Sequence, residues 1–371
     1  MNDPGRSLAK PVAEGDVRAR VHSTIRSDVQ ALRAYDVAKA SGLIKLDAME
    51  SPFALPEALR RRLAKRLASV PVNRYPDGPG DDVKDAIRRA MPVPDNAALI
   101  LGNGSDELIQ LITTAIAAPS ACVLAPDPSF VMYRLNAMHN RVRFHGVALH
   151  DDFSLDEPAM LDAIEREGPA LVWLAYPNNP TGNRFATASV ERILARAPGL
   201  VVVDEAYYAF ADDSFLPRVL DFQNLVVVRT VSKIGLAGLR LGYAAGHPAW
   251  IGELEKIRPP YNVNALTQAA VPIVLDAADV LAEHAAAIRA ERHRLADALA
   301  ARSDVRVFPT ETNFVLVRVP DGDRWFAALR SARILVKNLG GYHPLLANCL
   351  RITVGSPEEN DALLEAMRAI Q

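Results

Sequence analysis

The sequence predicts an α/β protein, in which helices cover both faces of a mostly parallel sheet of the seven-stranded type and a smaller α+β domain is attached. Strand patterns and helix patterns alternate through the middle of the chain, which is typical of parallel strands joined by helices. The expected strands are continuous apolar runs, such as Leu200-Val201-Val202-Val203. Because such a run shows no alternation of apolar and polar residues, it favours a strand that is buried on both faces.

The expected elements follow one another in a regular order. Pro56 lies in the first turn of the first helix, and a strand over 97–101 turns at Gly102-Asn103-Gly104-Ser105 into a helix over 106–117. The next strands are expected at 121–125, 141–148, 170–175, 200–204, 225–229 and 239–245, with helices such as 156–167 and 187–197 between them. After them, strands at 304–308, 313–319, 333–337 and 349–354 mix with helices at 323–332 and 357–369.

These elements predict four segments, because a chain of 371 residues is too long for one compact core. Leu281, Ile288 and Leu295 lie on one heptad line, which favours a long helix that packs on the sheet or joins two domains. The segments are an N-terminal arm with the start of the small domain (1–45), a large cofactor-binding domain (46–265), a connecting helical region (266–300) and a small C-terminal α+β domain (301–371).

Composition excludes several classes of protein. A formal net charge of −2 does not favour nucleic-acid binding. No apolar run reaches the length of a membrane span, and the polar N-terminus lacks the core of a signal peptide, so we expect a cytoplasmic protein. Cys122 and Cys349 both lie in apolar stretches, which favours buried free thiols in a reducing compartment. The eight histidines show no metal-ligand spacing, so no metal site is expected.

Three of the expected strands lead to polar residues at one edge of the sheet. The strand over 170–175 leads to Asn179, and the strand over 200–204 ends in Asp204, with Tyr207 about one helical turn further. The strand over 225–229 leads to Lys233. These side chains suit pyridoxal 5'-phosphate (PLP): lysine forms an imine with its aldehyde, aspartate pairs with the ring nitrogen, and asparagine and tyrosine hydrogen-bond the ring hydroxyl oxygen.

Two of these residues have an alternative interpretation. A lysine in a loop is usually solvated, but Lys233 follows an apolar strand and lies among small residues. We therefore expect it against the sheet edge, where loss of water lowers its pKa and makes it a nucleophile. Asp204 could cap a helix or join a buried salt bridge, since a carboxylate after four apolar residues is costly to bury alone. A protonated pyridine ring would supply the missing positive partner.

The cofactor phosphate also needs hydrogen-bond donors. Gly104-Ser105-Asp106 opens a helix, whose free N–H groups and positive dipole end attract phosphate, although such a turn is also an ordinary strand–helix connection. Thr230 and Ser232 add hydroxyl groups, and Arg240 adds a guanidinium group suited to bidentate contact. Phe130 begins a helix after a strand, where it either packs in the core or stacks on the pyridine ring.

With these motifs in this order, the chain resembles the fold-type I PLP-dependent aminotransferases, and within them the histidinol-phosphate aminotransferases. The resemblance extends from about Tyr35 to Glu359. It rests on Leu46-Asp47-Ala48-Met49-Glu50-Ser51-Pro52, Arg74-Tyr75-Pro76-Asp77, Gly104-Ser105-Asp106-Glu107-Leu108-Ile109, Pro177-Asn178-Asn179-Pro180-Thr181-Gly182, Asp204-Glu205-Ala206-Tyr207, the Lys233 loop, Pro260-Tyr261-Asn262-Val263-Asn264, Thr312-Asn313-Phe314 and Cys349-Leu350-Arg351-Ile352-Thr353-Val354-Gly355.

The resemblance implies a role for each cofactor-binding residue. Lys233 would carry the cofactor and then move a proton between the substrate's α-carbon and the C4′ carbon of the cofactor. Asp204 would hold the ring nitrogen, Tyr207 and Asn179 would hold the ring hydroxyl oxygen, and Phe130 would stack on the ring. Thr230, Ser232, Arg240 and the backbone of Gly104, Ser105 and Asp106 would hold the phosphate.

The resemblance also implies a homodimer with shared active sites, because Tyr75 would reach the phosphate of the neighbouring subunit's cofactor. Arg351 matches the arginine that grips the anionic group of the substrate, and arginine suits either a carboxylate or a phosphate. Lys337 and Tyr35 would assist it in binding the substrate. Many relatives carry arginine at the position of Lys337.

The reaction implied is the conversion of L-histidinol phosphate and 2-oxoglutarate to imidazole acetol phosphate and L-glutamate, in histidine biosynthesis. An aromatic amino acid aminotransferase or a threonine-phosphate decarboxylase of the same subfamily would share every cofactor residue. A ligand-sensing PLP domain of a transcription regulator would need a DNA-binding module, and the first 40 or so residues show no helix-turn-helix pattern. A catalytically dead scaffold is disfavoured, because every cofactor group is present.

Two positions depart from the pattern of the relatives. Lys233 and Arg240 are seven positions apart, one fewer than in many relatives, so the loop between them must be tighter. Ser51 stands where many relatives carry asparagine.

Overall fold

The computed structural model describes residues 13–32 and 38–370, and the chain divides into two compact units, Met1–Lys39 and Ala40–Gln371. In the first unit, α1 (Glu14–Thr24) is followed by the short α2 (Ser27–Gln30). No side chain of α1 is buried, and a salt bridge between Glu14 and Arg18 joins two of its turns. Tyr35, expected at the substrate site, lies outside the described residues.

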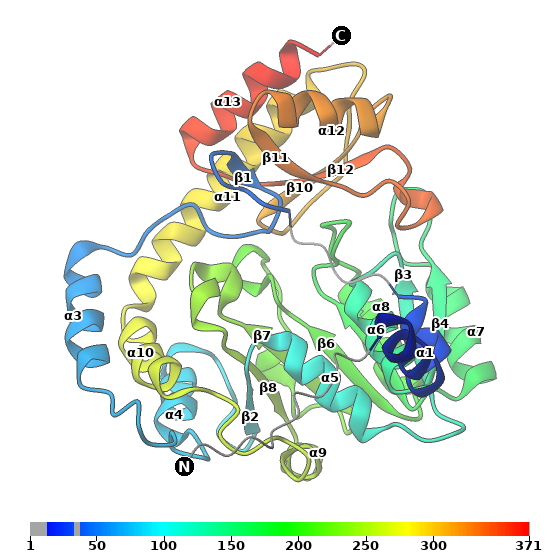
Figure 1. Ribbon diagram of the computed structural model, residues 1–371, viewed down its shortest axis with the longest axis vertical. Coiled ribbons are helices and arrows are strands. Elements are labelled where there is room, and N and C mark those ends of the chain that lie inside the picture. The colour runs from blue at the N-terminus through cyan, green and yellow to red at the C-terminus, as the bar shows by residue number, and fades with distance from the viewer. Residues whose placement is uncertain (1–12, 33–37, 371) are drawn as a thin grey trace, which may run out of the picture. The chain divides into compact units, whose positions relative to one another are not determined.

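The second unit contains the large sheet that the sequence predicts, and this confirms the fold class (Figure 1). Its strand order is β2-β8-β7-β6-β5-β3-β4. Strand β8 runs antiparallel to both of its neighbours, and the other neighbouring strands are parallel. The strands are β2 (Ala98–Gly102), β3 (Cys122–Asp127), β4 (Arg143–Ala148), β5 (Leu171–Ala175), β6 (Leu200–Asp204), β7 (Leu225–Thr230) and β8 (Gly242–Gly246).

The central strands are apolar throughout because both faces of the sheet are covered. In β6, Val201 and Val203 pack on one side with residues of α4, α7, α8 and α10, while Leu200 and Val202 pack on the other with residues of α5, α6 and α9. Successive side chains of a strand point to opposite faces, so every position of β6 is buried. The helices are α4 (Asp81–Ala90), α5 (Ser105–Ala115), α6 (Val131–His139), α7 (Glu157–Glu167), α8 (Thr187–Arg196), α9 (Pro248–Glu255) and α10 (Ala265–Leu275); α3 (Glu57–Ala68) packs on α10.

A second, five-stranded sheet has the order β1-β11-β12-β10-β9. Its first strand comes from the beginning of the unit and pairs in parallel with β11. Trp325 of α12 and Leu363 of α13 lie in the core of this sheet. The elements are β1 (Ile44–Leu46), β9 (Arg306–Val307), β10 (Phe314–Arg318), β11 (Ile334–Asn338), β12 (Cys349–Thr353), α12 (Gly322–Ser331) and α13 (Pro357–Arg368).

The long helix α11 (Ala278–Ala300) contributes to both cores. Leu281 belongs to the core of the large sheet, whereas Ile288 and Leu295 belong to the core of the small one, so the predicted heptad line runs from one sheet to the other (Figure 1). Among the described residues, no single helix is long and apolar enough to cross a membrane. Helices α10 and α11, bent by 79° at their junction, meet that criterion only as a pair, by length and composition.

Two expected strands were wrong in extent. The strand expected at 239–245 begins only at Gly242, because Ala237–Leu239 forms a 3-10 turn and Arg240 has a left-handed backbone (φ 48°). The strand expected at 304–308 is reduced to Arg306–Val307. Neither difference changes the strand order.

Candidate active site

The strands β5, β6 and β7 are neighbours and deliver their following residues to one edge of the sheet. Ala175, the last residue of β5, pairs with Asp204, the last residue of β6, and Asp204 pairs with Val228 of β7. The segments that carry Asn179 and Lys233 therefore begin on either side of Asp204. This is the convergence that the apolar runs of the sequence predict.

Asp204 is a buried carboxylate whose hydrogen-bond donors are both neutral. Its side chain is 5% exposed, Oδ2 accepts a hydrogen bond of 2.7 Å from Tyr133 Oη, and Oδ1 accepts one of 3.1 Å from the backbone N–H of Ala206. Burial raises its pKa to about 6, although both hydrogen bonds favour the ionised form. The geometry therefore leaves room for a cationic partner, and it does not match a helix cap, since Ala206 lies in a turn.

Tyr133 is a site residue that the sequence analysis missed. It lies in α6, is 1% exposed, and stacks on Trp173 with ring centroids 4.8 Å apart and an interplanar angle of 4°. The Phe130 ring meets it edge-on at 5.7 Å. Tyr133 lies three residues after Phe130, and residues three apart share one face of a helix. The sequence did not show, however, that this face points at Asp204.

Tyr207 lies just after Asp204 and is held in place by the turn that follows it. Two arginines of α11 bind carbonyl groups of this turn: Arg289 donates to Ala209 O (2.7 Å) and Arg292 to Phe210 O (3.1 Å). Tyr207 itself is 3% exposed, and burial raises the pKa of its hydroxyl. It is therefore a neutral hydrogen-bond donor at physiological pH.

Lys233 lies in a 3-10 turn directly after β7, as expected from the small residues around it. The turn ends at Gly235, whose φ of 99° is a conformation that favours glycine. Lys233 Nζ donates to the carbonyl oxygen of Ala48 at 3.4 Å. Removal from water, and then the positive charge of Arg351, lower the pKa of Lys233 to about 8. About a tenth of this amine is therefore uncharged at pH 7, far more than for a lysine with an ordinary pKa.

The beginning of α5 forms a cradle with the start of β8. Gly104 has φ 86°, and a Cβ atom there would lie 2.7 Å from Arg240 Nη2; a Cβ atom on Gly242 would lie 2.6 Å from the backbone nitrogen of Ser105. The guanidinium of Arg240 thus lies directly over the first turn of α5, in spite of the short loop from Lys233. Arg240 also approaches Asp106 Oδ2 at 3.8 Å.

Two buried hydroxyl groups lie at the end of β7, beside the Lys233 turn. The hydroxyl of Thr230 lies 2.9 Å from Ser232 Oγ and 3.1 Å from the carbonyl oxygen of Leu241. The backbone N–H of Ser232 donates to Thr230 Oγ1 at 3.1 Å. The sequence predicted both hydroxyls as phosphate donors.

The small sheet contributes Arg351 of β12. Its side chain is largely buried, and Nη1 donates to Asn179 Oδ1 at 2.6 Å while Nη2 donates to the carbonyl oxygen of Asp47 at 3.2 Å. Lys337 of β11 is the cross-strand partner of Arg351, and its Nζ lies 5.4 Å from the centre of the Tyr342 ring. A guanidinium from one sheet thus meets an asparagine from the other.

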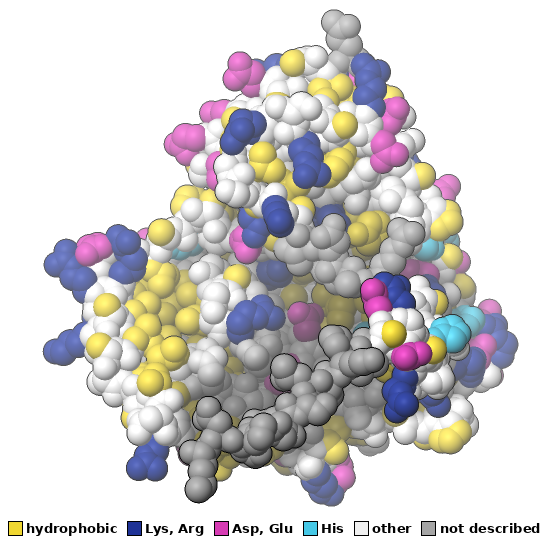
Figure 2. Space-filling model, viewed as in Figure 1, with side chains coloured by type: hydrophobic (Ala, Val, Ile, Leu, Met, Phe, Trp, Pro, Cys, Tyr) yellow, Lys and Arg dark blue, Asp and Glu magenta, His cyan; other side chains and the backbone are white. Residues whose placement is uncertain are grey.

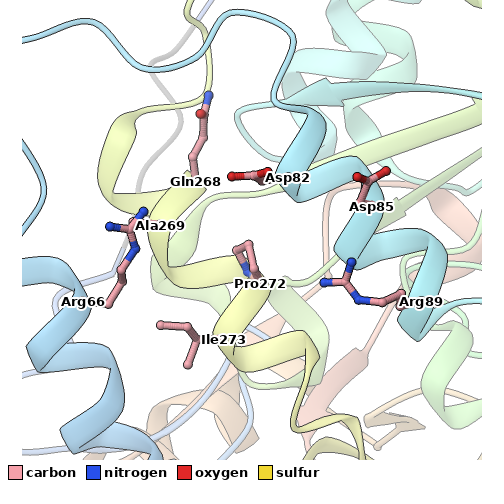
Figure 3. A pocket seen from close by; sticks show the side chains of 8 residues that line it. All are labelled: Arg66, Asp82, Asp85, Arg89, Gln268, Ala269, Pro272 and Ile273. Atoms are coloured by element: carbon pink, nitrogen blue, oxygen red, sulfur yellow. The ribbon is translucent and has the colours of Figure 1, made fainter.

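Tyr75 lies away from these contacts. Its side chain is 81% exposed and stacks on Tyr261 at a centroid distance of 4.7 Å. A separate pocket of about 270 Å³ lies between α3, α4 and α10, and no candidate site residue lines it (Figure 3). Its charged lining residues are Arg66, Asp82, Asp85 and Arg89.

Most of the chain matches one known protein family. Residues 41–367 match the family described as aminotransferase class I and II. A histidinol-phosphate aminotransferase from Chromobacterium violaceum is 54% identical over 352 residues, which is 95% of this chain and 99% of that protein. Another from Ralstonia nicotianae is 55% identical over 93% of this chain and 94% of its own length.

The chain belongs to the class I and II aminotransferases.

A solved structure agrees with this membership and with the cofactor. The histidinol-phosphate aminotransferase from Sinorhizobium meliloti, determined in complex with pyridoxal-5'-phosphate, is 26% identical and superimposes with a TM-score of 0.81 over 94% of this chain and 99% of that one. The expected aminotransferase family, fold type and PLP dependence are thus confirmed.

The described residues of this aminotransferase fit PLP on chemical grounds. A phosphate group fits the cradle at Gly104, which a Cβ atom would fill and which Arg240 covers. A protonated ring nitrogen fits Asp204, whose buried carboxylate has no cationic hydrogen-bond partner among the described residues. An aldehyde fits Lys233, whose pKa is lowered to about 8.

We predict that Asp204 makes the stability of the cofactor-free aminotransferase depend on pH. Its folded-state pKa is raised, so the stability it contributes is complete below about pH 4 and is lost as the pH rises through about 6. Relative to Asp204→Asn, the wild-type protein should lose roughly 1 kcal/mol between pH 5 and pH 7.5. Tyr133→Phe, which removes a donor to the carboxylate, should increase that loss.

Urea unfolding of the three proteins at both pH values measures this difference. Comparison with Asp204→Asn removes the contribution of every other titrating group. Identical pH dependence in the wild-type protein and Asp204→Asn would show that the carboxylate has an ordinary pKa in the fold.

Proposed function

We propose that this aminotransferase transfers the amino group of L-histidinol phosphate to 2-oxoglutarate, giving imidazole acetol phosphate and L-glutamate, a step of histidine biosynthesis. The observation that carries the proposal is the identity of 54–55% with histidinol-phosphate aminotransferases over almost the whole chain. The site agrees with it, because one buried arginine of the small sheet points toward the cofactor-binding edge of the large one.

In this proposal, the large sheet holds the cofactor. When bound, PLP acts as an electron sink for the bond that breaks at the substrate's α-carbon. Asp204 pairs with the ring nitrogen and keeps it protonated, and Tyr133 keeps Asp204 in place and ionised. Tyr207 and Asn179 would hydrogen-bond the ring hydroxyl oxygen, and Phe130 would cover one face of the ring.

The first turn of α5 would hold the phosphate of the cofactor. The backbone N–H groups of Ser105 and Asp106 belong to this turn, where the helix dipole favours an anion. The expectation for the Gly104 N–H was wrong, because it donates to the carbonyl oxygen of Gly102 at 2.8 Å. Thr230 and Ser232 add hydroxyl donors and Arg240 adds a positive charge.

Lys233 carries the cofactor and then transfers the proton at the substrate's α-carbon. Its amine is partly deprotonated near neutral pH, because burial lowers its pKa to about 8. A group with a pKa close to the working pH can both accept and return a proton. The Nζ atom therefore serves as base and as acid in the two directions of the transfer.

Arg351 binds the anionic group of each substrate. Its guanidinium can pair with the phosphate of the amino donor in one half-reaction and with a carboxylate of 2-oxoglutarate in the other. Lys337, its cross-strand neighbour, adds a second positive charge, and Tyr35 is proposed to assist it. An aromatic amino acid aminotransferase or a threonine-phosphate decarboxylase would use the same cofactor residues, so the donor must be tested directly.

We expect the enzyme to prefer histidinol phosphate over histidinol and over phenylalanine by at least a few hundredfold in kcat/KM. A site built for a phosphate leaves its buried donors unpaired when the phosphate is missing. Arg351→Ala should remove most of this preference and also weaken 2-oxoglutarate, whereas Arg306→Ala, which removes an exposed arginine of the same small sheet, should not. Steady-state kinetics with a panel of donors measures the preference; equal use of phenylalanine or tyrosine would favour the aromatic aminotransferase.

We also propose a homodimer in which Tyr75 reaches the partner's cofactor phosphate. Tyr75 and Tyr261 form an exposed aromatic stack. On the face that Figure 2 shows, hydrophobic side chains gather between α3 and α10. Such a patch on an otherwise polar surface is typical of a protein interface. The exposed large hydrophobic residues of the two segments that carry this stack are Val72, Tyr75, Ile257, Tyr261 and Leu266.

Subunit exchange should reveal the shared sites. Tyr75→Phe and Lys233→Ala proteins each have only impaired sites, but a mixed dimer has one site with both Tyr75 and Lys233 intact. Activity should therefore rise when the two proteins are mixed and allowed to exchange, and a mixture kept from exchanging is the control. An active monomer in analytical ultracentrifugation would contradict the proposal.

The proposed compartment is the cytoplasm. Cys122 and Cys349 are both buried and free, as is usual for proteins of reducing compartments. Fractionation of cells against a cytosolic marker tests this assignment.

A further inference from the structure

The loop after β1 presents three consecutive carbonyl groups, each of which accepts a hydrogen bond from a different part of the site. Asp47 O accepts from Arg351 Nη2 at 3.2 Å, Ala48 O accepts from Lys233 Nζ at 3.4 Å, and Met49 O accepts from Asn313 Nδ2 at 2.9 Å. We call residues 47–49 the carbonyl loop. It joins the proposed lysine and the proposed substrate-binding arginine through backbone atoms alone.

Met49 is the residue of the carbonyl loop whose backbone is held by hydrogen bonds on both sides. Its N–H donates to Thr353 Oγ1 at 2.9 Å, so both of its backbone polar groups bind side chains of the small sheet. Its φ is 55°, a conformation that is uncommon for residues other than glycine and that persists only where the surroundings hold it. The chain therefore adopts an unfavourable backbone angle where two side chains bind it.

The two side chains that bind Met49 are themselves rigidly placed. Asn313 is fully buried and Thr353 is 3% exposed. Asn313 precedes β10 and Thr353 ends β12, and these antiparallel strands pair Phe314 with Thr353. The backbone N–H of Val354 also donates to Asn313 O at 2.9 Å.

We propose that Asn313 and Thr353 are positioning residues for Lys233, which they orient by fixing the carbonyl loop so that Ala48 O binds the lysine amine. The inference rests on the proposed role of Lys233 as the cofactor-binding lysine. Both residues bind Met49, the neighbour of Ala48, so they act on Lys233 through the loop. The hydrogen bond to Ala48 directs one N–H of Lys233 toward the loop.

The step that this positioning serves is the attachment of the cofactor. The Lys233 nitrogen bonds to the aldehyde carbon of PLP, the aldehyde oxygen leaves as water, and no further reactant is needed. A nucleophile that is already oriented reacts faster than one that must first be ordered. Loss of the Met49 contacts should therefore slow attachment.

Attachment of PLP to the cofactor-free protein, followed by absorbance in a stopped-flow instrument, tests the proposal. Thr353→Val keeps the shape of the side chain but removes the hydroxyl that binds Met49, and we expect attachment to slow by roughly tenfold. Thr353→Ser keeps the hydroxyl and should react within about twofold of the wild-type rate. Met49→Gly combined with Thr353→Val should recover part of the rate, because glycine adopts the left-handed conformation at little cost.

Two results would overturn the proposal. One is attachment at the wild-type rate in both Thr353→Val and Asn313→Ala. The other is an equal loss of rate in Thr353→Val and Thr353→Ser, accompanied by an equal fall in Tm, which would indicate a role in folding alone. Whether wild-type protein attaches PLP at all tests the proposed role of Lys233, and this reaction needs no amino donor. The positioning is tested separately, by the ratio of the attachment rates of the variants to the wild-type rate.

Discussion

The site depends on a carboxylate that the fold places in an almost dry position. Asp204 ends a strand in which every residue is buried, and its two hydrogen-bond donors are neutral. A buried charge of this kind is costly without a cation, which is why its pKa rises to about 6. The cofactor's ring nitrogen is the cation that this arrangement suits.

The large sheet and the small sheet contribute different residues to the candidate site. Parallel strands bring Asn179, Asp204 and Lys233 to one edge because their carboxyl ends lie together. The small sheet adds Arg351 and the carbonyl loop, which meet Asn179 and Lys233 respectively. The residues proposed for cofactor chemistry and the residue proposed for substrate binding thus come from different sheets, and a few hydrogen bonds join them.

Much of the fold, and the convergence of the candidate site residues at one sheet edge, could be predicted from the sequence. The apolar runs gave the buried parallel strands, and the polar residues after them gave Lys233, Asp204 and Asn179, because strand ends in a parallel sheet converge by geometry. The late start of β8 could not be predicted, since it depends on the left-handed backbone of Arg240 over Gly104. Tyr133 and the Met49 contacts were missed for the same kind of reason. Their partners are far away in the sequence, and only tertiary packing brings them together.

Identifying the lysine that binds the cofactor tests this account most directly. Reduction of the purified yellow protein with borohydride should fix the cofactor permanently to its lysine, and mass spectrometry of the digested protein should then find the label on the peptide that contains Lys233. Lys233→Ala protein, treated in the same way, should carry no label. A label on any other lysine, including Lys337 beside Arg351, would contradict the account of how the sheet edge binds the cofactor.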